Sequence, residues 1–166
     1  YIDELTIGIE YDDEGKQHMI MNGMDVSDEI RTQDISQKAS LVSAHAVVRQ
    51  MLLDMQRDVA KKHNVIMDGR DIGTVVFPTA ELKLFLTASP EVRAERRYEE
   101  LKMKGESPIY EDVLADVNDR DYRDTHRAES PLRQAEDAVV VDNSNMTREE
   151  QMQYIIGVFR ERCTTV

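Results

Sequence analysis

The sequence predicts an α/β fold, in which a parallel sheet is covered by helices and a small β-rich segment precedes it. From residue 64 onward, short apolar runs alternate with amphipathic helical segments, an order that is typical of parallel strands joined by helical crossovers. The first 30 residues instead hold two apolar runs around an acidic turn, which indicates an antiparallel hairpin. We therefore expect two domains, an insert over 1–62 and a core domain over 63–166.

The insert is predicted to consist of a hairpin followed by a long helix. Residues 5–11 and 17–21 form the two expected strands, and Asn22-Gly23 marks a further turn. An isolated hairpin is marginally stable in water, so a third strand or a helix is expected to support it. The helix is expected from about residue 34 to residue 62, because apolar residues recur there at helical spacing.

The core domain is predicted to contain three helices and three strands. Ser89-Pro90 is a favourable helix start, with serine as cap and proline in the first turn, and this helix is expected to run until Gly105. Ser107-Pro108 is expected to open the second helix, and the capping box at 147–150 the third. The strands are expected at 64–68, 82–87 and 138–142.

Composition excludes several classes of function. A formal net charge of −12 argues against non-specific nucleic-acid binding, which requires a basic face. A single cysteine excludes an internal disulfide framework, and four histidines without metal-ligand spacing argue against a zinc site. The sequence has neither an apolar run of transmembrane length nor a signal peptide, so we expect a cytoplasmic protein without a membrane partner.

Charged residues follow the first predicted core strand, within 68–71. In open α/β sheets, ligands bind outside the carboxyl ends of the strands, where this segment is expected to lie. The planar guanidinium of Arg70 suits a phosphate group, and the carboxylate of Asp68 suits a metal ion or its waters. The alternative is a solvated turn in which Arg70 and Asp71 have no ligand.

A second charged segment spans residues 119–127. Arg120, Asp124 and Arg127 share one face of a helix, at positions i, i+4 and i+7. Two arginines beside one aspartate suit a phosphorylated sugar, because the arginines bind the phosphate while the aspartate accepts from ribose hydroxyls. The alternative is a solvated face of ion pairs, such as Asp116 with Arg120 and Arg120 with Asp124.

Two further pairs of polar residues are weaker candidates. Arg93 and Arg97 lie four residues apart in the first turns of a helix, where arginines gain nothing from the helix dipole. A phosphate-facing role is therefore favoured over capping, with plain solvent exposure as the alternative. Ser40 and Arg49 lie in the expected long helix, and neither stands out from ordinary surface residues.

Taken together, residues 26–32, 68–78 and 120–127 resemble the bacterial cytidylate kinases, which phosphorylate CMP and dCMP. The resemblance runs along essentially the whole chain. It implies the fold of the P-loop nucleoside monophosphate kinases, with a β-rich CMP-binding insert over 1–30 and a mobile lid over about 91–108. The implied reaction is in-line transfer of the ATP γ-phosphoryl group, with Mg²⁺, in which positioning and charge neutralisation dominate.

The resemblance also implies a role for each candidate residue. Ser40, Arg49 and Asp71 would bind the cytosine edge, and Asp124 the ribose hydroxyls. Arg70, Arg127 and Arg120 would be the catalytic arginines around the CMP phosphate. Arg93 and Arg97 would contact ATP from the lid, and Asp68 would hold Mg²⁺ through its waters.

One element of the family is not found in these residues. None of them reads Gly-x-x-x-x-Gly-Lys-Ser/Thr, the loop that cradles the ATP phosphates. We therefore expect a kinase whose N-terminal P-loop segment and central strand are missing from this sequence, with that segment or a second chain completing the sheet. Such a chain would be inactive alone. A non-catalytic CMP-binding fragment, and a kinase of the same fold for another nucleoside monophosphate, remain alternatives.

Overall fold

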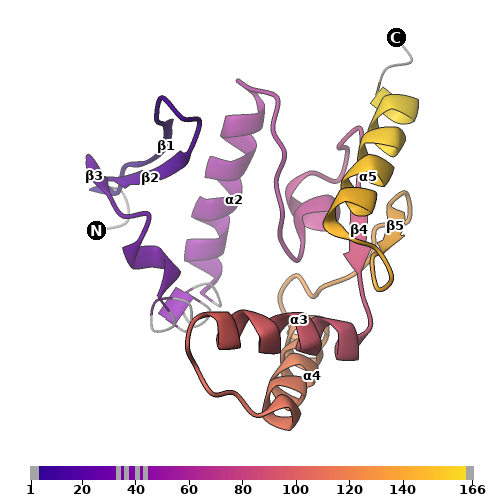
Figure 1. Cartoon of the computed structure of the whole chain (residues 1–166). Coiled ribbons are helices and arrows are strands. Elements are labelled where there is room, and N and C mark those ends of the chain that lie inside the picture. Colours follow the sequence, from indigo (N-terminus) through magenta and orange to yellow (C-terminus); the bar gives the residue numbers. More distant parts are fainter. Residues whose placement is uncertain (1–3, 33–34, 36–37, 40–41, 43–44, 164–166) are drawn as a thin grey trace. The chain divides into compact units, whose positions relative to one another are not determined.

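The computed structural model describes residues 4–32, 35, 38–39, 42 and 45–163 (Figure 1). The chain forms two compact units, residues 1–55 and residues 56–166. The boundary between them falls inside helix α2 (Ala46–Ala60), so that this helix contributes to both units.

The first unit contains a three-stranded antiparallel sheet in the order β1-β2-β3. Ile9 of β1 lies opposite Met19 of β2, and Met21 of β2 opposite Met24 of β3. The predicted hairpin is therefore confirmed, and the third strand gives it the support that two strands alone lack. The strands are β1 (Ile7–Tyr11), β2 (Gln17–Met21) and β3 (Met24–Asp25).

The two turns of this sheet contain residues with positive φ. Gly15, with φ of 77°, ends the turn between β1 and β2, and the Gly15 amide donates to the Asp12 carbonyl at 2.9 Å. Asn22 and Gly23, with φ of 50° and 79°, form the turn between β2 and β3. Asparagine and glycine tolerate this left-handed region best, which is why the dipeptide predicted the turn correctly.

The helix predicted over 34–62 is confirmed as α2 over Ala46–Ala60, but it is not a single helix, because the chain bends at His45. A short 3₁₀ helix, η2 (Glu29–Arg31), follows the sheet, and residues 35, 38, 39 and 42 are helical. The chain then bends at His45 before α2 begins at Ala46. Apolar periodicity identifies a helical stretch but does not reveal a bend within it.

The second unit contains a parallel pair of strands, as the alternation of strands and helices predicted. Leu84 of β4 pairs with Val139 of β5, and Thr87 pairs with Asp142 at the carboxyl ends. Parallel strands require a long crossover, and here two helices and their loop provide it. The elements are β4 (Leu84–Thr87), α3 (Pro90–Met103), α4 (Tyr110–His126), β5 (Val139–Asp142) and α5 (Arg148–Cys163).

Two of the three predicted helix starts are confirmed by their capping bonds. The Ser89 hydroxyl accepts from the Val92 amide at 3.3 Å at the start of α3. At the start of α5, the Thr147 hydroxyl accepts from the Glu150 amide, and the Glu150 carboxylate accepts from the Thr147 amide at 2.8 Å. This reciprocal pair is a capping box.

The third predicted start, at Ser107-Pro108, is wrong. Helix α4 begins at Tyr110, its cap position is Ile109, and no side chain caps it. A serine before a proline favours a helix start only when its hydroxyl can reach the amides of the first turn. Here the serine lies two residues too early for this.

The predicted strand at 64–68 is also wrong. These residues have no regular secondary structure, and the Ile66 side chain is fully exposed. Among the described residues, β4 forms a ladder only with β5. An apolar run becomes a strand only when a neighbouring strand pairs with its amides and carbonyls. The apolar pattern alone therefore predicted a strand here that does not form.

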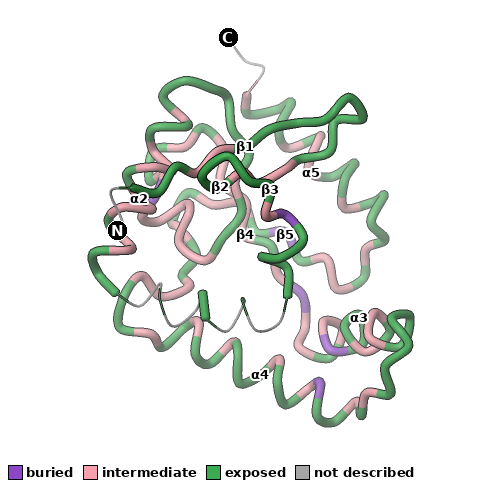
Figure 2. Tube along the Cα trace, turned by 90° about the vertical axis from the view of Figure 1, so that its left-hand side faces the viewer, coloured by how far each residue is buried: buried purple, intermediate pink, exposed green. Residues whose placement is uncertain are grey.

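Few of the described residues are fully buried (Figure 2). Ala94 of α3 and Val113 of α4 are buried where these two helices pack together. Val141 of β5 is the largest side chain that is almost completely buried. The described helices include none that is long and apolar enough to cross a membrane.

Candidate functional site

The loop at 69–71 brings Arg70 to helix α4. Arg70 Nε donates a hydrogen bond to Asp124 Oδ2 at 2.8 Å, and both side chains are partly buried. Arg120 Nε lies 3.9 Å from the same carboxylate oxygen. The structure therefore brings three of the predicted site residues together, and their main contact links two segments that are distant in sequence.

A single turn of π-helix, η3 (Ile72–Val76), follows this loop. The Val76 amide donates to the Asp71 carbonyl at 3.2 Å, and the Phe77 amide donates to the Ile72 carbonyl at 2.7 Å. Both bonds span five residues, the spacing that defines a π-helix, and such turns are frequently found at functional sites. Asp71 is the cap residue that precedes this turn, directly after Arg70.

Gly69 fits this turn because it has no side chain. A Cβ atom at residue 69 would lie 2.8 Å from Ile72 Cγ1, closer than such atoms approach one another. The glycine that precedes Arg70 is therefore required by close packing against the π-turn rather than by a positive φ.

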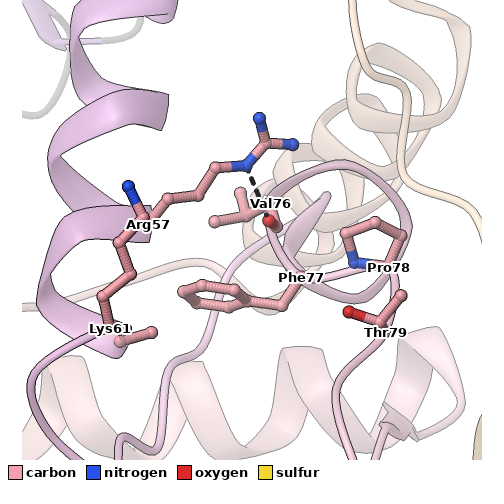
Figure 3. Close-up of a pocket in the computed structure, with 7 residues that line it drawn as sticks. Arg57, Lys61, Val76, Phe77, Pro78 and Thr79 are labelled. Atoms are coloured by element: carbon pink, nitrogen blue, oxygen red, sulfur yellow. Dashed lines mark hydrogen bonds between the residues drawn. The ribbon is translucent and has the colours of Figure 1, made fainter.

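Arg57 of α2 supports the π-turn, a role that no sequence pattern indicated. Its Nε donates to the Val76 carbonyl at 3.1 Å (Figure 3). Its Nη2 donates to the Val75 carbonyl at 2.8 Å. These carbonyls end a short helix, where a cation is favourable. A hollow of about 450 Å³ lies beside this contact, lined by Arg57, Ala60, Lys61, Val76, Phe77, Pro78 and Thr79.

Asp121 of α4 forms a two-pronged ion pair with Arg93 of α3. Arg93 Nη1 and Nη2 donate to the two carboxylate oxygens at 2.7 and 2.6 Å. Hydrogen bonding from Arg93, with smaller effects of Arg70 and Arg120, holds the pKa of Asp121 below its ordinary value. The same bond raises the pKa of Arg93, so the pair is fully ionised at neutral pH.

The other predicted ATP-contacting residue, Arg97, lies one turn further along α3. Its Nη1 is 2.9 Å from Glu100 Oε2 in an exposed pair. Lys104 pairs with the other oxygen of Glu100, and the two cations lower the pKa of Glu100 to about 2. An ATP contact of Arg93 or Arg97 stays a prediction.

Arg127 follows the last turn of α4. Its Nε donates to the Ser130 carbonyl at 2.8 Å, and Nη2 donates to the same oxygen. Ser130 has a φ of 47°, and the Leu132 amide donates to the Asp124 carbonyl at 2.8 Å, so the chain reverses tightly here. The Arg127 guanidinium thus faces the reversal in this structure.

The remaining predicted residues are placed separately. Asp68 is exposed in the irregular segment before Gly69. Arg49 lies on α2 within the first unit, and Ser40 lies outside the described residues. The part of the chain that the structure describes holds no group of three histidine, cysteine or carboxylate side chains arranged for a metal ion.

A hollow of about 540 Å³ is lined by residues of α3, of α5 and of the loop between β5 and α5. Arg96 of α3 crosses to the loop after β5, where it donates to the Asn143 carbonyl at 2.7 Å and to Asn143 Oδ1 at 2.9 Å. The Ser89 amide donates to the Ser144 hydroxyl at 2.9 Å, which ties the two strand ends together. No sequence pattern predicted this hollow, which is lined by Arg96, Met146, Arg148, Gln151 and Met152.

Comparison with known proteins gives a consistent set of matches. The family model described as cytidylate kinase matches residues 3–161. A cytidylate kinase of Parabacteroides distasonis is 51% identical over 147 residues, which cover 89% of this chain and 64% of that protein. The cytidylate kinase of Bacteroides thetaiotaomicron is 47% identical over 145 residues, covering 87% and 63%.

A more distant relative extends the match. The cytidylate kinase of Lactobacillus johnsonii is 44% identical over 161 residues, which cover 97% of this chain and 70% of that protein. The chain thus spans slightly less than two thirds of the length of the first two relatives.

Proposed function

The chain belongs to the cytidylate kinase family, and from this premise we propose that the whole protein transfers the γ-phosphoryl group of ATP to CMP or dCMP, giving CDP or dCDP. The relatives that match are named for this activity. The fold is the α/β fold that the family implies, and the parallel pair β4-β5 with its helical crossover agrees with it.

The contact between Arg70 and Asp124 is the observation that supports the acceptor site best. A guanidinium and a carboxylate held together, with Arg120 beside them, offer both groups that a nucleoside monophosphate requires. Arg70 and Arg120 bind the phosphate, since guanidinium matches phosphate geometry, and Asp124 accepts from the ribose hydroxyls. Charge neutralisation by these arginines brings two anionic reactants together for in-line transfer.

Recognition of the base is assigned to Ser40, Arg49 and Asp71. Hydrogen-bonding groups in a closed pocket discriminate strongly between bases, because a wrong base leaves buried donors and acceptors unpaired. Arg49 belongs to the first unit, and Asp71 precedes the π-turn of the second unit. The insert over 1–62 is proposed to be the CMP-binding part, and residues 63–166 the core with its lid.

Arg127 has to change its partner in this proposal. Its guanidinium donates to the Ser130 carbonyl, a neutral acceptor, whereas a phosphate is a doubly charged one. Charge-assisted bonds are about twice as strong as neutral ones, so a bound phosphate competes effectively for this side chain. Arg127 then completes the set of three arginines around the phosphate.

The donor nucleotide is proposed to bind beyond the carboxyl ends of β4 and β5. Ligands of open α/β sheets bind at this edge. The hollow lined by Arg96 and Arg148 supports this proposal, because Arg96 also donates to the carbonyl of Asn143, the residue directly after β5. Arg93 and Arg97 belong to the proposed lid over about 91–108.

The described residues are compatible with a Mg²⁺ ion that is held mainly by the phosphates of the nucleotide. Magnesium in kinases is bound by one or two carboxylates, waters and substrate phosphates, so a dedicated protein cage is not required. Asp68, whose carboxylate is exposed next to the Arg70 loop, would hold the ion through its waters. When bound, the ion neutralises developing charge on the phosphates. A cytoplasmic location is proposed, where ATP and CMP are available.

Calorimetric titration of CMP into the protein tests this proposal. We expect saturable binding that UMP and AMP compete for only weakly, and that Asp124→Asn or Arg127→Ala strongly reduces. Asp116→Asn is a matched control, because Asp116 is an exposed aspartate of the same helix. Equal binding of all three nucleotides would contradict cytosine recognition, whereas CMP binding without phosphoryl transfer by the whole protein would indicate a non-catalytic binding protein.

A further inference from the structure

We infer that Arg93 and Asp121 are positioning residues for the acceptor site: their ion pair holds α4 against the start of α3, so that Asp124 meets Arg70. This inference rests on the proposed function, because it assigns a purpose to residues that surround the proposed CMP site. It gives Arg93 a role in acceptor binding that is separate from any contact with ATP.

The contact has the geometry of a rigid clamp. Both terminal nitrogens of Arg93 donate to Asp121, one to each carboxylate oxygen, at 2.7 and 2.6 Å. Such a two-pronged pair fixes orientation as well as distance. Arg93 Nε donates in addition to the Ala88 carbonyl at 3.0 Å, and Ala88 is buried directly after β4. The guanidinium therefore connects the end of β4 to α4.

The two helices are held at the other end of their contact by aromatic packing. The rings of Tyr98 and Tyr110 meet edge to face, with centroids 6.0 Å apart. Ala94 is completely buried, and its small methyl group allows α4 to pack closely against α3. The hairpin of α3 and α4 is thus closed near its loop by the tyrosines and at its base by the ion pair.

The clamp lies one helical turn from the proposed site. Asp121 and Asp124 are three residues apart in α4 and therefore lie on neighbouring positions of one face. Asp121 is held from α3 and Asp124 is held by Arg70, so α4 is fixed at two successive turns. If the contact between Arg93 and Asp121 is lost, fewer interactions fix the rotation of α4 about its axis. Asp124 is then less well preorganised to meet Arg70.

Electrostatics and positioning predict opposite effects of a change at Asp121. Asp121 is an anion near Arg70 and Arg120, which are proposed to bind a phosphate. Neutralising it would strengthen phosphate binding if its charge alone mattered, because like charges repel. If Asp121 positions α4, neutralising it weakens CMP binding. The sign of the change therefore separates the two explanations.

The first experiment compares Asp121→Asn with Asp116→Asn by calorimetric titration of CMP, without ATP, into the whole protein. Both substitutions remove one negative charge from α4. We expect Asp121→Asn to weaken CMP binding about fivefold, the effect of losing a partly exposed two-pronged pair, while Asp116→Asn changes it less than about twofold. Unchanged or tighter binding by Asp121→Asn would overturn the inference.

The second experiment compares Arg93→Ala, Arg93→Lys and, as a control in the same helix, Lys104→Ala. Lys104 pairs with Glu100 near the end of α3, and because Glu100 also pairs with Arg97, this variant is a control for CMP affinity and not for ATP affinity. We expect the loss of CMP affinity to be largest for alanine and smaller for lysine, which restores the charge but not the fork. Affinity for ATP alone is measured in parallel. A loss confined to ATP would show that Arg93 is only a donor ligand and would overturn the inference.

The result for the unaltered protein separates failure of the proposed function from failure of this inference. If the protein does not bind CMP, the proposed function fails and the inference fails with it. If it binds CMP and the Asp121 and Arg93 variants bind equally well while remaining folded, only the inference fails. Melting temperatures identify any variant that does not fold, and Arg93→Lys, the mildest change, then decides.

Discussion

Asp124 Oδ2 accepts a hydrogen bond from Arg70 Nε at 2.8 Å across 54 residues of sequence, and Arg120 lies 3.9 Å from the same oxygen. In the proposed acceptor site, the arginines that attract a phosphate are therefore partly neutralised by the carboxylate that binds the sugar. A nucleotide that engages both groups replaces this pair with two contacts of its own. A phosphate without a sugar engages only one of them.

The first prediction concerns the sugar. Asp124→Asn is expected to lower affinity for CMP about 10- to 100-fold, because a charged acceptor for ribose hydroxyls is lost. Affinity for dCMP should fall less, since dCMP has one hydroxyl fewer to lose. Calorimetric titration of both nucleotides measures the difference, and an equal loss for both would argue that Asp124 does not contact the ribose.

The second prediction concerns the packing of Gly69. Gly69→Ala is expected to destabilise the protein by about 1–3 kcal/mol, because the new methyl group would lie 2.8 Å from Ile72 Cγ1. Urea unfolding measures the change. Gly157→Ala is the matched control: a methyl group at residue 157 would have no neighbouring atom within 4 Å, and the residue lies inside α5, so alanine there should be stabilising by about 0.5–1 kcal/mol.

The third prediction concerns the support of the π-turn. Arg57→Ala is expected to cost about 1–3 kcal/mol in unfolding free energy, because the Val75 and Val76 carbonyls lose their side-chain donors. CMP affinity should also fall, since the turn positions Asp71 and Arg70.

The control for this prediction is Lys61→Ala. Lys61 lies one turn further along the chain and pairs with exposed Asp58, so its loss should have little effect on stability. Equal unfolding midpoints for the two variants would contradict a structural role of Arg57.

The fourth prediction concerns pH and the sheet of the first unit. His18 Nδ1 lies 2.6 Å from Asp25 Oδ2, and Nε2 lies 3.2 Å from Asp12 Oδ2. Hydrogen bonds to Asp25 and then Asp12 raise the pKa of His18 above 6.5. The Asp25 carboxylate also accepts from the hydroxyl and amide of Ser27, and these bonds, with that of His18, lower its pKa to about 2.

The direction of each shift defines the pH range of greatest stability. The contribution of His18 is complete below pH 6.5 and is lost as pH rises through its raised pKa. The contribution of Asp25 is complete above pH 3.8 and is lost as pH falls through about 2. Protection of the Met19 amide, which donates to the Ser27 hydroxyl, should therefore decrease on both sides of this range.

Hydrogen exchange followed by NMR measures this profile. His18→Gln, which cannot become charged, should remove the loss at the alkaline end and keep the loss at the acidic end. An alkaline loss that persists in this variant would assign it to another group.

Local sequence signals predicted the elements whose ends are fixed by local bonds. The caps at Ser89 and Thr147 and the turn at Asn22-Gly23 depend on residues within three or four positions, so the sequence contains the whole interaction. The predicted strand at 64–68 failed because a strand depends on a partner that is distant in sequence.

The candidate site divides in the same way. The spacing of Arg120 and Asp124 predicted their shared face, and their proximity is observed. The closer contact of Asp124 is with Arg70, and the partner of Arg93 is Asp121; both depend on how α4 packs. Charge patterns along one helix give no information on such contacts, and for the same reason the role of Arg57 was not predicted.

The pairing of β4 with β5 alone, among the described residues, has a consequence for how these 166 residues behave as salt is added. An unpaired strand edge is a template for another chain, and Leu86 beside it is about half exposed. The net charge of −12 keeps copies apart at low ionic strength. Since salt shortens the range of this repulsion to about 8 Å at physiological strength, these 166 residues should remain dispersed in dilute buffer and associate as salt is added.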